Sequence, residues 1–519
     1  MLYRNPIIPG YSPDPSICRV GEDFYLVNST FEFFPGVPIY HSKNLVNWEL
    51  IHYCLSRPSQ LYLEGCRNSG GIYAPTIRYQ DGIFYMITTN VTDKGNFVVH
   101  TKDIYGEWSE PAWIDQGGID PSLFWDEDGT CYYCSTGVLD GVRGIVAFRI
   151  NPITGEILSE KYLISEGCGG QCAEGPHIYK RNGWYYLMLA EGGTEYGHRE
   201  TIQRSQEIFG PYSPAPQNPI LTHMEYKKSE IQATGHADLV EDQNGNTWAV
   251  FLGIRKFGHP LLHNLGRETF LAPVTWDLDG WPVIGNSGRV ELVMDGPLPY
   301  KGKTVDHSRW FDFGISPLGK ELFYTRNPIK EHYQLNTKKQ ELMLIGTKVT
   351  LNEAGASPTI LNLRQPDFDT VVTAWICVEQ CTAKRCGISA YYNNNYHYDL
   401  YLGVKNGAYY IGFYKHIHDF GMEIERIPIT DKGELQLQIR TNREGYGFFY
   451  RTENKTEFNQ IGFGHIAGLC TEGTMSMTFT GTLFSMFCED GIGVFTKGLD
   501  MKVERNENDE KRGERCDID

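Results

Sequence analysis

Three acidic residues occupy matching positions in a repeated sequence pattern, and such residues can transfer protons when they meet in one pocket. Asp14 lies in S-P-D-P-S, Asp120 in I-D-P-S and Glu174 in A-E-G-P-H. A protonated carboxyl can give its proton to a leaving oxygen, while an ionised one can act on water or on a sugar carbon. Because the three residues are far apart along the chain, only a fold that gathers distant segments can bring them together.

The repeat itself predicts such a fold. Five stretches share one design, in which a short apolar strand is followed by a polar turn and an aromatic strand: 12–27, 73–87, 119–134, 173–189 and 234–251. They align on the strand residues Ile17, Ile77, Leu123, Ile178 and Leu239, and the aromatic partner follows eight or nine positions later. Three positions before these anchors stand Asp14, Ala74, Asp120, Gly175 (with Glu174 beside it) and His236. A repeat of roughly 50–60 residues made of strands and turns is typical of a β-propeller with one blade per repeat.

The innermost strands of a propeller surround one axis, so equivalent positions on them lie close together. We therefore expect Asp14, Asp120, Glu174 and His236 to converge. An aspartate before a proline is, taken alone, more often a turn former than a catalytic group. Three acidic residues in register across separate repeats are hard to explain as turns, and we favour a functional site.

The chain divides into two regions of different character. A length of 519 residues suggests more than one domain, and the repeats occupy 1–300. Residues 301–310, at the end of a stretch rich in Pro, Gly and Lys, are expected to form a linker. Short alternating strands without the repeat follow over 311–503 and are typical of a two-sheet β-sandwich. The charged residues 504–519 are predicted to form a flexible tail.

Composition excludes some partners. Lys and Arg number 47 against 64 Asp and Glu, and the net charge of −17 argues against nucleic acid or an anionic membrane as a partner. The first residues contain no apolar run of signal-peptide length, and no segment is apolar enough to cross a bilayer. The 13 cysteines are odd in number and scattered, which is typical of reduced thiols in a cytoplasmic protein. Cys131 and Cys134 form a C-x-x-C inside a predicted strand, so a metal or redox role is not expected there.

Several motifs carry a resemblance to a known family: S-P-D-P-S-I, S-T-F-E-F-F-P-G-V, G-G-I-Y-A-P, I-D-P-S-L-F, E-G-P-H and L-G-R-E-T. Together they resemble glycoside hydrolase family 43, in particular its two-domain β-xylosidases and α-L-arabinofuranosidases. The segment FTGTLFSMFCEDG at 479–491 is similar to the sandwich appended in those enzymes. The resemblance implies an all-β fold, with a five-bladed β-propeller followed by a concanavalin-like β-sandwich.

The resemblance also assigns roles in hydrolysis with inversion of configuration. Asp14 matches the general base that deprotonates water, and Glu174 matches the general acid that protonates the departing oxygen. Asp120 matches a third carboxylate that raises the pKa of the acid and orients it. A neighbouring negative charge does disfavour ionisation of an acid. An inverting pair is expected to stand roughly 6.5–9.5 Å apart, because a water molecule must fit between the two groups.

Other residues match positions around the sugar. Phe31 and Tyr73 would shape its subsite, Ala74 would line it, and Thr194 lies on a Gly-rich loop at the rim. Arg267 would hydrogen-bond sugar hydroxyls through its forked guanidinium. The related xylosidases usually have Trp where this chain has Tyr73, which leaves the sugar preference open.

His236 matches a histidine that faces a metal or water in the central channel of some relatives. A lone histidine on a strand is otherwise a hydrogen-bonded core residue. No cofactor is expected to be required, and a structural divalent cation such as calcium would be coordinated largely by water.

The leading hypothesis is an exo-acting enzyme that releases terminal L-arabinofuranose or D-xylose from arabinoxylan- or xylan-derived oligosaccharides, with the arabinofuranosidase-containing branch favoured by resemblance. The alternative is a non-catalytic glycan-binding propeller with a lectin-like sandwich, because propellers host many functions. A lectin would not need an acid, a base and a third carboxylate in register. The resemblance further implies a cytoplasmic enzyme that assembles into homo-oligomers and closes its pocket with a loop of the second domain.

Overall fold

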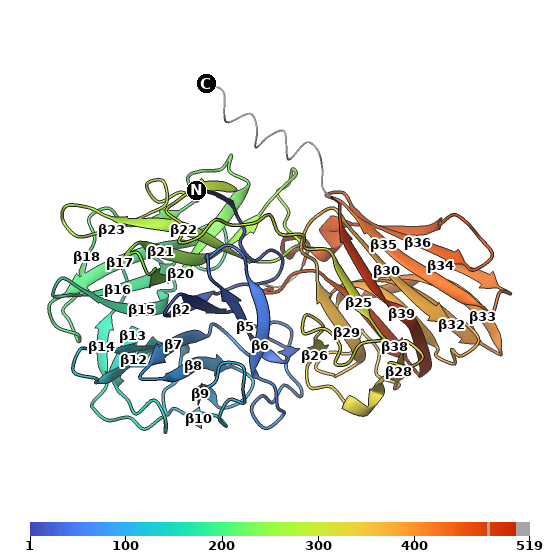
Figure 1. Ribbon diagram of the computed structural model, residues 1–519, viewed down its shortest axis with the longest axis horizontal. Helices are drawn as coiled ribbons and strands as arrows, with labels where there is room; N and C mark the ends of the chain where they lie inside the picture. The colour runs from blue at the N-terminus through green and yellow to red at the C-terminus, as the bar shows by residue number, and fades with distance from the viewer. Residues whose placement is uncertain (475–477, 505–519) are drawn as a thin grey trace.

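The computed structural model describes residues 1–474 and 478–504, which form mostly strands arranged in two bodies (Figure 1). The first half of the chain makes five antiparallel sheets around one axis, and the second half makes two larger sheets packed face to face. The predicted five-bladed propeller with a C-terminal sandwich is therefore confirmed. In the described residues, no helix is long and apolar enough to cross a membrane.

Each propeller blade is an antiparallel sheet whose first strand is innermost. Blade 1 is β2 (Ser16–Val20), β3 (Asp23–Val27), β5 (Gly36–Ser42) and β6 (Glu49–Leu55). Blade 2 is β7 (Thr76–Gln80), β8 (Ile83–Asn90), β9 (Gly95–Thr101) and β10 (Ala112–Trp113). Blade 3 is β11 (Ile119–Trp125), β12 (Cys131–Leu139), β13 (Val142–Arg149) and β14 (Tyr162–Ser165). Blade 4 is β15 (Glu174–Arg181), β16 (Trp184–Glu191), β17 (Arg199–Ser205), β18 (Ser213–Pro214) and β19 (Leu221–Thr222). Blade 5 is β20 (Ile231–Glu241), β21 (Thr247–Arg255), β22 (Glu268–Trp276) and β23 (Pro282–Ile284).

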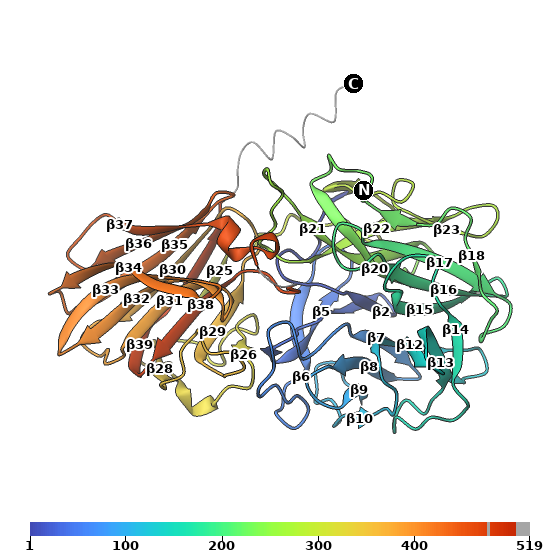
Figure 2. The same cartoon turned by 180° about the vertical axis from the view of Figure 1, so that it is seen from behind.

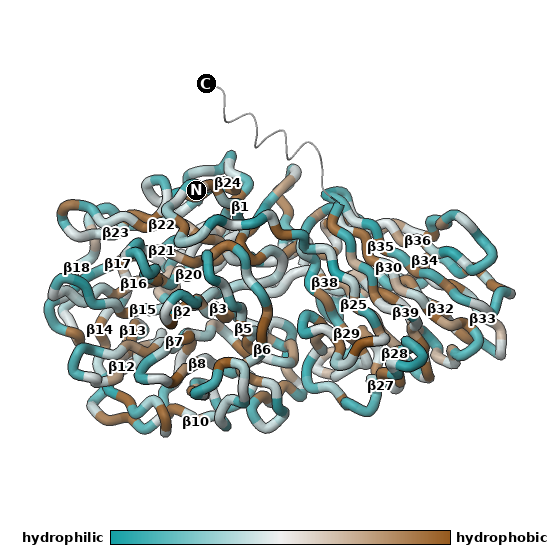
Figure 3. Tube along the Cα trace, in the orientation of Figure 1, coloured by the Kyte–Doolittle hydropathy of each residue, from teal (hydrophilic) through white to brown (hydrophobic). Residues whose placement is uncertain are grey.

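The repeat anchors and their aromatic partners fill the spaces between blades. Ile77 of blade 2 packs with Tyr25 of blade 1, and Leu123 of blade 3 packs with Tyr85 of blade 2. In blade 3 the fully buried aromatic residue is Tyr133 rather than Tyr132, which the repeat alignment selects. Burial of each large ring between sheets stabilises the stacked blades, and Figure 3 shows hydrophilic segments gathered in the outer loops.

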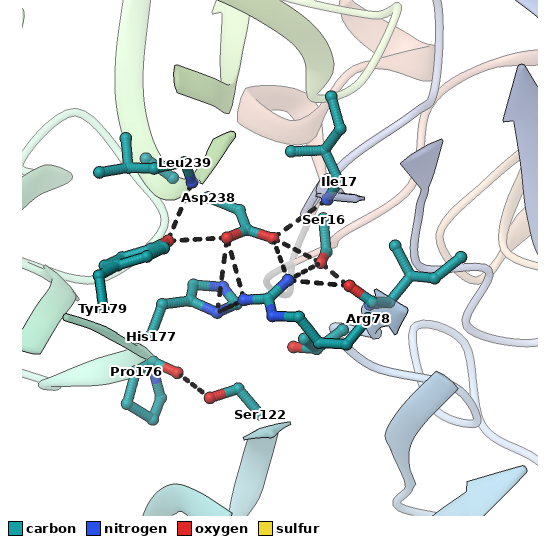
Figure 4. A network of polar contacts seen from close by, with 12 residues as sticks. Ser16, Ile17, Arg78, Ser122, Pro176, His177, Tyr179, Asp238 and Leu239 are labelled. Carbon is teal, nitrogen blue, oxygen red and sulfur yellow. Dashed lines mark hydrogen bonds and ion pairs between the residues drawn. The ribbon is translucent and has the colours of Figure 1, made fainter. Parts of the chain in front are cut away.

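A polar network on the axis joins the innermost strands (Figure 4). At its centre is Asp238 of β20, a fully buried carboxylate. It accepts hydrogen bonds from Ser16 (2.6 Å), from Arg78 (2.7 and 3.1 Å) and from the Tyr179 hydroxyl (2.7 Å). Although burial opposes its ionisation, the Arg78 guanidinium holds the pKa of Asp238 well below its usual range. Burial lowers the pKa of His177 to about 3, so its neutral Nδ1 accepts a hydrogen bond from Arg78 at 2.9 Å.

The same layer ties every blade to its neighbour. Thr76 of blade 2 donates to the Pro121 carbonyl of blade 3 (3.0 Å), and Ser122 donates to the Pro176 carbonyl of blade 4 (2.6 Å). Asp238 joins blade 5 to blades 1, 2 and 4. Side-chain hydrogen bonds therefore connect the innermost strands of the five blades around the axis.

The second body is a β-sandwich with two sheets of unequal size. The larger sheet contains β25 (Arg309–Asp312), β27 (Tyr333–Asn336), β28 (Glu341–Gly346), β30 (Thr370–Cys377), β35 (Glu434–Thr441), β36 (Gly445–Thr452), β37 (Asn459–His465) and β39 (Gly491–Val503). The smaller sheet contains β29 (Thr359–Arg364), β31 (Arg385–Asn393), β32 (Tyr396–Lys405), β33 (Ala408–Ile417), β34 (Phe420–Ile429) and β38 (Leu483–Glu489). Alternate side chains of both sheets meet in one apolar core, and their alternation along each strand is what the sequence pattern predicts.

Strand β25 begins inside the stretch 301–310 that was expected to be a linker. Phe311 belongs to the sandwich core, and its neighbours pair with β39, so packing extends the sandwich to Arg309. The predicted tail at 504–519 lies outside the described residues from 505 onward. Three short 3-10 turns occur among the described residues: η1 (Lys330–His332), η2 (Ile466–Leu469) and η3 (Thr471–Gly473).

The two bodies are joined by strands as well as by side chains. Two small sheets remain, β1 (Leu2–Arg4) with β24 (Val293–Asp295), and β4 (Phe33–Phe34) with β26 (Tyr324–Thr325). The second of these pairs crosses between the bodies, because β4 lies in the connection between β3 and β5 of blade 1 and β26 belongs to the second half of the chain. An apolar cluster that includes Tyr11 and Phe31 on one side and Tyr391 and Phe487 on the other lies at the same interface. Figure 2 shows loops of the sandwich reaching toward the centre of the propeller.

Candidate active site

The residues that the repeat aligns share an unusual backbone conformation. Asp14, Asp120, Gly175 and His236 all have positive φ, between 50° and 57°. In β11, β15 and β20 a β-bulge falls at this position. A bulge beside an active site re-aims a side chain, and left-handed non-glycine residues often mark functional sites. The shared geometry directs side chains from blades 1, 3, 4 and 5 toward the axis.

Blade 4 places its acidic residue one position earlier, because a glycine must stand at the bulge. Gly175 has φ +57°, and a Cβ there would lie 3.0–3.1 Å from three ring atoms of His236. Only glycine allows this backbone to pass the His236 ring without a shift. Glu174, the preceding residue, therefore carries the acidic side chain of this blade, and Gly175 donates its N–H to Asp120 at 3.2 Å.

Asp14 is buried and held by two donors. Ser29 donates its hydroxyl to Oδ2 at 2.5 Å, and Nη1 of Arg267 donates to Oδ1 at 2.9 Å. Asp14 is 5% exposed, so the ion pair with Arg267 lies in a region of low dielectric, where it orients the carboxylate strongly. This arrangement suits a carboxylate that must stay ionised.

The other two carboxyl groups are close enough to influence each other and Asp14. Burial and, after it, the negative charge of Asp14 raise the pKa of Glu174 to about 7. Burial also raises the pKa of Asp120 well above its usual range, with additional contributions from Glu174 and then Asp14. Glu174 and Asp120 therefore both hold a proton more readily than an ordinary carboxyl group does. The largest causes for Glu174 are burial and Asp14, whereas Asp120 was expected from the resemblance to be the modulating group.

Three aromatic rings surround the carboxylates. Phe31 lies 5.5 Å from Tyr73 and 5.5 Å from Phe479 between ring centroids, and Tyr73 lies 5.9 Å from Phe479. The charge of Asp120 contributes to the raised pKa of Tyr73, after burial, which places this ring beside the site. Ala74, next in the chain, is buried. Phe479 belongs to the second domain, and the sequence did not single out this residue.

Arg267 and Thr194 also lie together at this place. Arg267 was expected to hydrogen-bond sugar hydroxyls, but its guanidinium already contacts several protein groups. The same Nη1 that contacts Asp14 donates to Thr194 at 2.9 Å, and Nη2 donates to the Phe479 carbonyl at 3.3 Å. The guanidinium lies 5.6 Å from the Phe31 ring and 5.3 Å from the Phe479 ring. Arg267 thus ties the base, the rim loop and the second domain together, and within the described residues its Nε alone has no partner.

His236 lies beside the site without a set of metal ligands. Burial lowers its pKa, so the ring is neutral near pH 7. No group of three or more His, Cys, Asp or Glu side chains in the described part of the chain is arranged to hold a metal ion. The residues present therefore do not fit an ion held by protein ligands, and a largely water-coordinated calcium ion stays a prediction.

Two residues of the site, Ser29 and Phe479, were not predicted from the sequence. Ser29 stands in the motif S-T-F-E-F-F-P-G-V, which was recognised without assigning this hydroxyl a role. Phe479 opens the segment that resembles the appended sandwich, yet nothing in its neighbourhood indicates a contact with blade 1. Contacts between domains leave no periodic signal in a sequence, so only the structure reveals them.

A five-bladed propeller that gathers three acidic residues beside a cluster of aromatic rings is the arrangement expected of a glycoside hydrolase, and comparisons with known proteins agree. Residues 3–282 match the family model described as Glycosyl hydrolases family 43, and 311–497 match the Beta xylosidase C-terminal Concanavalin A-like domain. The chain belongs to glycoside hydrolase family 43.

Individual relatives cover nearly the whole chain. A non-reducing end alpha-L-arabinofuranosidase of Bacteroides ovatus is 42% identical over 451 residues, covering 86% of this chain and 84% of its own length. A xylosidase/arabinosidase of Butyrivibrio fibrisolvens is 39% identical over 421 residues, covering 78% of this chain and 80% of its own length. A solved structure described as Bacteroides ovatus Xyloglucan PUL GH43B superposes with a TM-score of 0.91 at 37% identity, covering 97% of this chain and all of that one. The lectin alternative is therefore set aside, and the protein is a glycoside hydrolase.

Proposed function

We propose that this enzyme releases single terminal α-L-arabinofuranosyl or β-D-xylosyl residues from arabinoxylan- or xylan-derived oligosaccharides, with inversion of configuration. The observation that carries the proposal is the meeting of Asp14, Asp120 and Glu174, from three blades, beside one aromatic wall. The names of the relatives, an arabinofuranosidase and a xylosidase/arabinosidase, support a pentose as the released sugar.

In the proposed reaction Asp14 accepts a proton from a water molecule whose oxygen attacks the anomeric carbon. Glu174 gives its proton to the glycosidic oxygen as the bond from that oxygen to the anomeric carbon breaks. The sugar leaves as a hemiacetal of opposite configuration, and the remaining chain leaves with a free hydroxyl. Water restores the proton of Glu174 and removes that of Asp14. The reaction requires only protein carboxyl groups and water.

The remaining residues would bind and orient the sugar. Phe31 and Tyr73 offer apolar faces to the carbon-bound hydrogens of a pentose, and Phe479 limits the length of the subsite from the side of the second domain. A subsite bounded on this side favours removal of one residue at a time. Arg267 fixes Asp14 and Thr194 in place around the sugar. Asp120 orients Glu174 through the Gly175 N–H.

We also propose a location and an assembly state. All the cysteines in the described residues are free, which supports a reducing, cytoplasmic setting in which short imported oligosaccharides are digested. Assembly into homo-oligomers stays a prediction. Size-exclusion chromatography with light scattering measures the oligomeric state directly.

Side-by-side rates on 4-nitrophenyl α-L-arabinofuranoside and 4-nitrophenyl β-D-xyloside test the proposed activity. We expect release of at least one pentose, and free pentose as the first product from an arabinoxylan oligosaccharide. Release of neither pentose, or longer fragments as the first products, contradicts the proposal. Proton NMR of the first anomer released from the xyloside tests the inversion.

A further inference from the structure

A chain of hydrogen bonds runs behind the aromatic wall from the propeller to the second domain. Glu32 follows Phe31 in the sequence, and its Oε2 accepts the N–H of Ser69 at 3.0 Å. The hydroxyl oxygen of Ser69 in turn accepts the N–H of Phe479 at 3.0 Å. One carboxyl group thus connects through one serine to the ring that the second domain contributes to the site.

Glu32 is an unusual residue to find at this place. Its side chain is 2% exposed, and burial raises its pKa to about 7 although Arg326 and Arg67 favour the charged form. Its backbone carbonyl also accepts the N–H of Arg326, at 2.7 Å, from the second domain. A buried carboxyl group is costly unless its hydrogen bonds are used, and an ionised one is a stronger acceptor than a neutral group. An ordinary domain contact could be made by apolar side chains instead.

The loop that contains Arg67 and Ser69, which Glu32 holds, contacts two of the three aromatic rings. Ser69 has φ 54°, a conformation that persists only where the surroundings enforce it. Arg67 of the same loop donates to the hydroxyl of Tyr73 at 3.1 Å, while Ser69 holds Phe479. A change in the loop would therefore move two walls of the sugar subsite together.

We propose that Glu32 is a positioning residue for the sugar subsite: by holding Ser69 it sets the placement of Phe479 against Phe31 and Arg267. The inference rests on the proposed function, because it names what determines the shape of that same subsite. Small displacements of groups that position a substrate can cost as much as 10²-fold in rate. Because a change at Glu32 leaves the reacting carboxylates in place, we expect it to weaken substrate binding rather than to slow the chemical step.

The kinetic test compares Glu32→Ala, Phe479→Ala and the double variant on the better of the two 4-nitrophenyl pentosides. We expect Glu32→Ala to raise KM about tenfold while kcat changes less than about threefold, the pattern of lost uniform binding. In the Phe479→Ala background the same substitution should raise KM by a smaller factor, because only the Tyr73 wall is then displaced. Glu32→Gln, which keeps an oxygen acceptor, should restore most of the lost affinity. An equal KM increase with and without Phe479, or no increase at all, overturns the proposal.

A second measurement does not depend on activity. Hydrogen exchange of the full chain should be faster at the amides of Ser69 and Phe479 in Glu32→Ala, with the other interdomain amides unchanged. Unchanged exchange at both amides refutes the role of Glu32 even if the wild-type protein hydrolyses neither pentoside. If Glu32→Ala does not fold, Ser69→Ala replaces it, with faster exchange expected at Phe479 only.

The matched control is Tyr53→Phe, which removes a different interdomain hydrogen bond, from the Tyr53 hydroxyl to the Lys320 carbonyl at 2.9 Å. It should leave KM and the exchange of Ser69 and Phe479 unchanged. A KM increase in this control equal to that of Glu32→Ala would mean that any interdomain contact has the same effect, and would also overturn the proposal.

Discussion

At the scale of single residues, the proposed acid and the proposed base differ in their environments. Asp14 is fixed by Arg267 and Ser29, whereas no hydrogen bond to the Glu174 carboxyl is seen among the described residues. Burial and the nearby charge of Asp14 then favour the protonated form of Glu174. Two carboxyl groups a short distance apart can thus take opposite roles at the same pH.

The role of Glu174 as the acid predicts a dependence on the leaving group. Glu174→Ala should lose at least about 10²-fold in kcat on natural oligosaccharides, because an alkoxide leaves poorly without a proton. The loss should be much smaller on 4-nitrophenyl pentosides, whose leaving group needs little protonation. Asp14→Ala should lose activity on both kinds of substrate, since water is not activated. Equal losses for Glu174→Ala on both substrates would remove Glu174 from the acid role.

The raised pKa of Glu174 also predicts the alkaline limb of the pH profile. The active enzyme holds a proton on Glu174, so kcat/KM on oligosaccharides should fall as pH rises through about 7. Above this value the decline should approach tenfold per pH unit. In Glu174→Gln, measured at whatever low rate remains, this limb should disappear. A limb that persists unchanged in the variant belongs to another group.

At the scale of elements, positive φ on or just before an innermost strand, with a β-bulge in β11, β15 and β20, is what aims the side chains of the site. The strain of positive φ at Asp14, Asp120 and His236 is of the order of 1–3 kcal/mol each and persists because the surrounding structure enforces it. In blade 4 the position is glycine, and the close approach of the His236 ring leaves no room for a side chain.

Gly175→Ala tests this geometry. The new Cβ would combine backbone strain with the contact to His236, and we expect a loss of about 2–4 kcal/mol in unfolding free energy. Activity should fall as well, because Glu174 precedes this residue. The matched control is Gly183→Ala in the turn of the same blade, where φ is +78° but no atom lies within 4 Å of the added Cβ. Chemical denaturation should show a smaller loss of unfolding free energy for the control than for Gly175→Ala. The rates of the control on the 4-nitrophenyl pentosides should be unchanged.

At the scale of the whole molecule, the ring of polar contacts on the axis holds five blades together beneath the carboxylates. Its charged centre is the pair of Arg78 and Asp238, in which the carboxylate is fully buried and the guanidinium is 18% exposed. Removing one partner of such a pair leaves an uncompensated buried charge, which is far more costly than the pair itself is stabilising.

Arg78→Met should therefore lower the free energy of unfolding by about 3–5 kcal/mol. Arg181→Met is the control, because Arg181 also links blades 4 and 5, but through an exposed pair with Glu241 at 3.7 Å. This control should cost at most about 1 kcal/mol. Denaturant titration followed by tryptophan fluorescence measures both. If the two variants lose similar amounts of unfolding free energy, the buried network is not the main link between the blades.

Much of this molecule follows from its sequence. The period of the strand–turn–strand pattern predicts the propeller, and the register of Asp14, Asp120 and Glu174 within that period predicts that they converge. The fold and the convergence can both be predicted, because strand alternation and turn residues are recognisable within a few positions. The same short pattern then recurs in every blade. The resemblance added Phe31, Tyr73, Ala74, Thr194 and Arg267, all of which the structure brings to the same end of the propeller axis.

Only the tertiary structure determines which hydrogen bonds, ion pairs and ring contacts these groups make with one another. It paired Arg267 with Asp14 and Thr194, made burial and Asp14 the main causes of the raised Glu174 pKa, and brought Phe479 from the second domain to Phe31. Burial, electrostatic neighbours and domain contacts depend on the distances between residues that are hundreds of positions apart. A local pattern fixes which face of a strand a side chain occupies, but the packing of the two bodies fixes what that side chain meets.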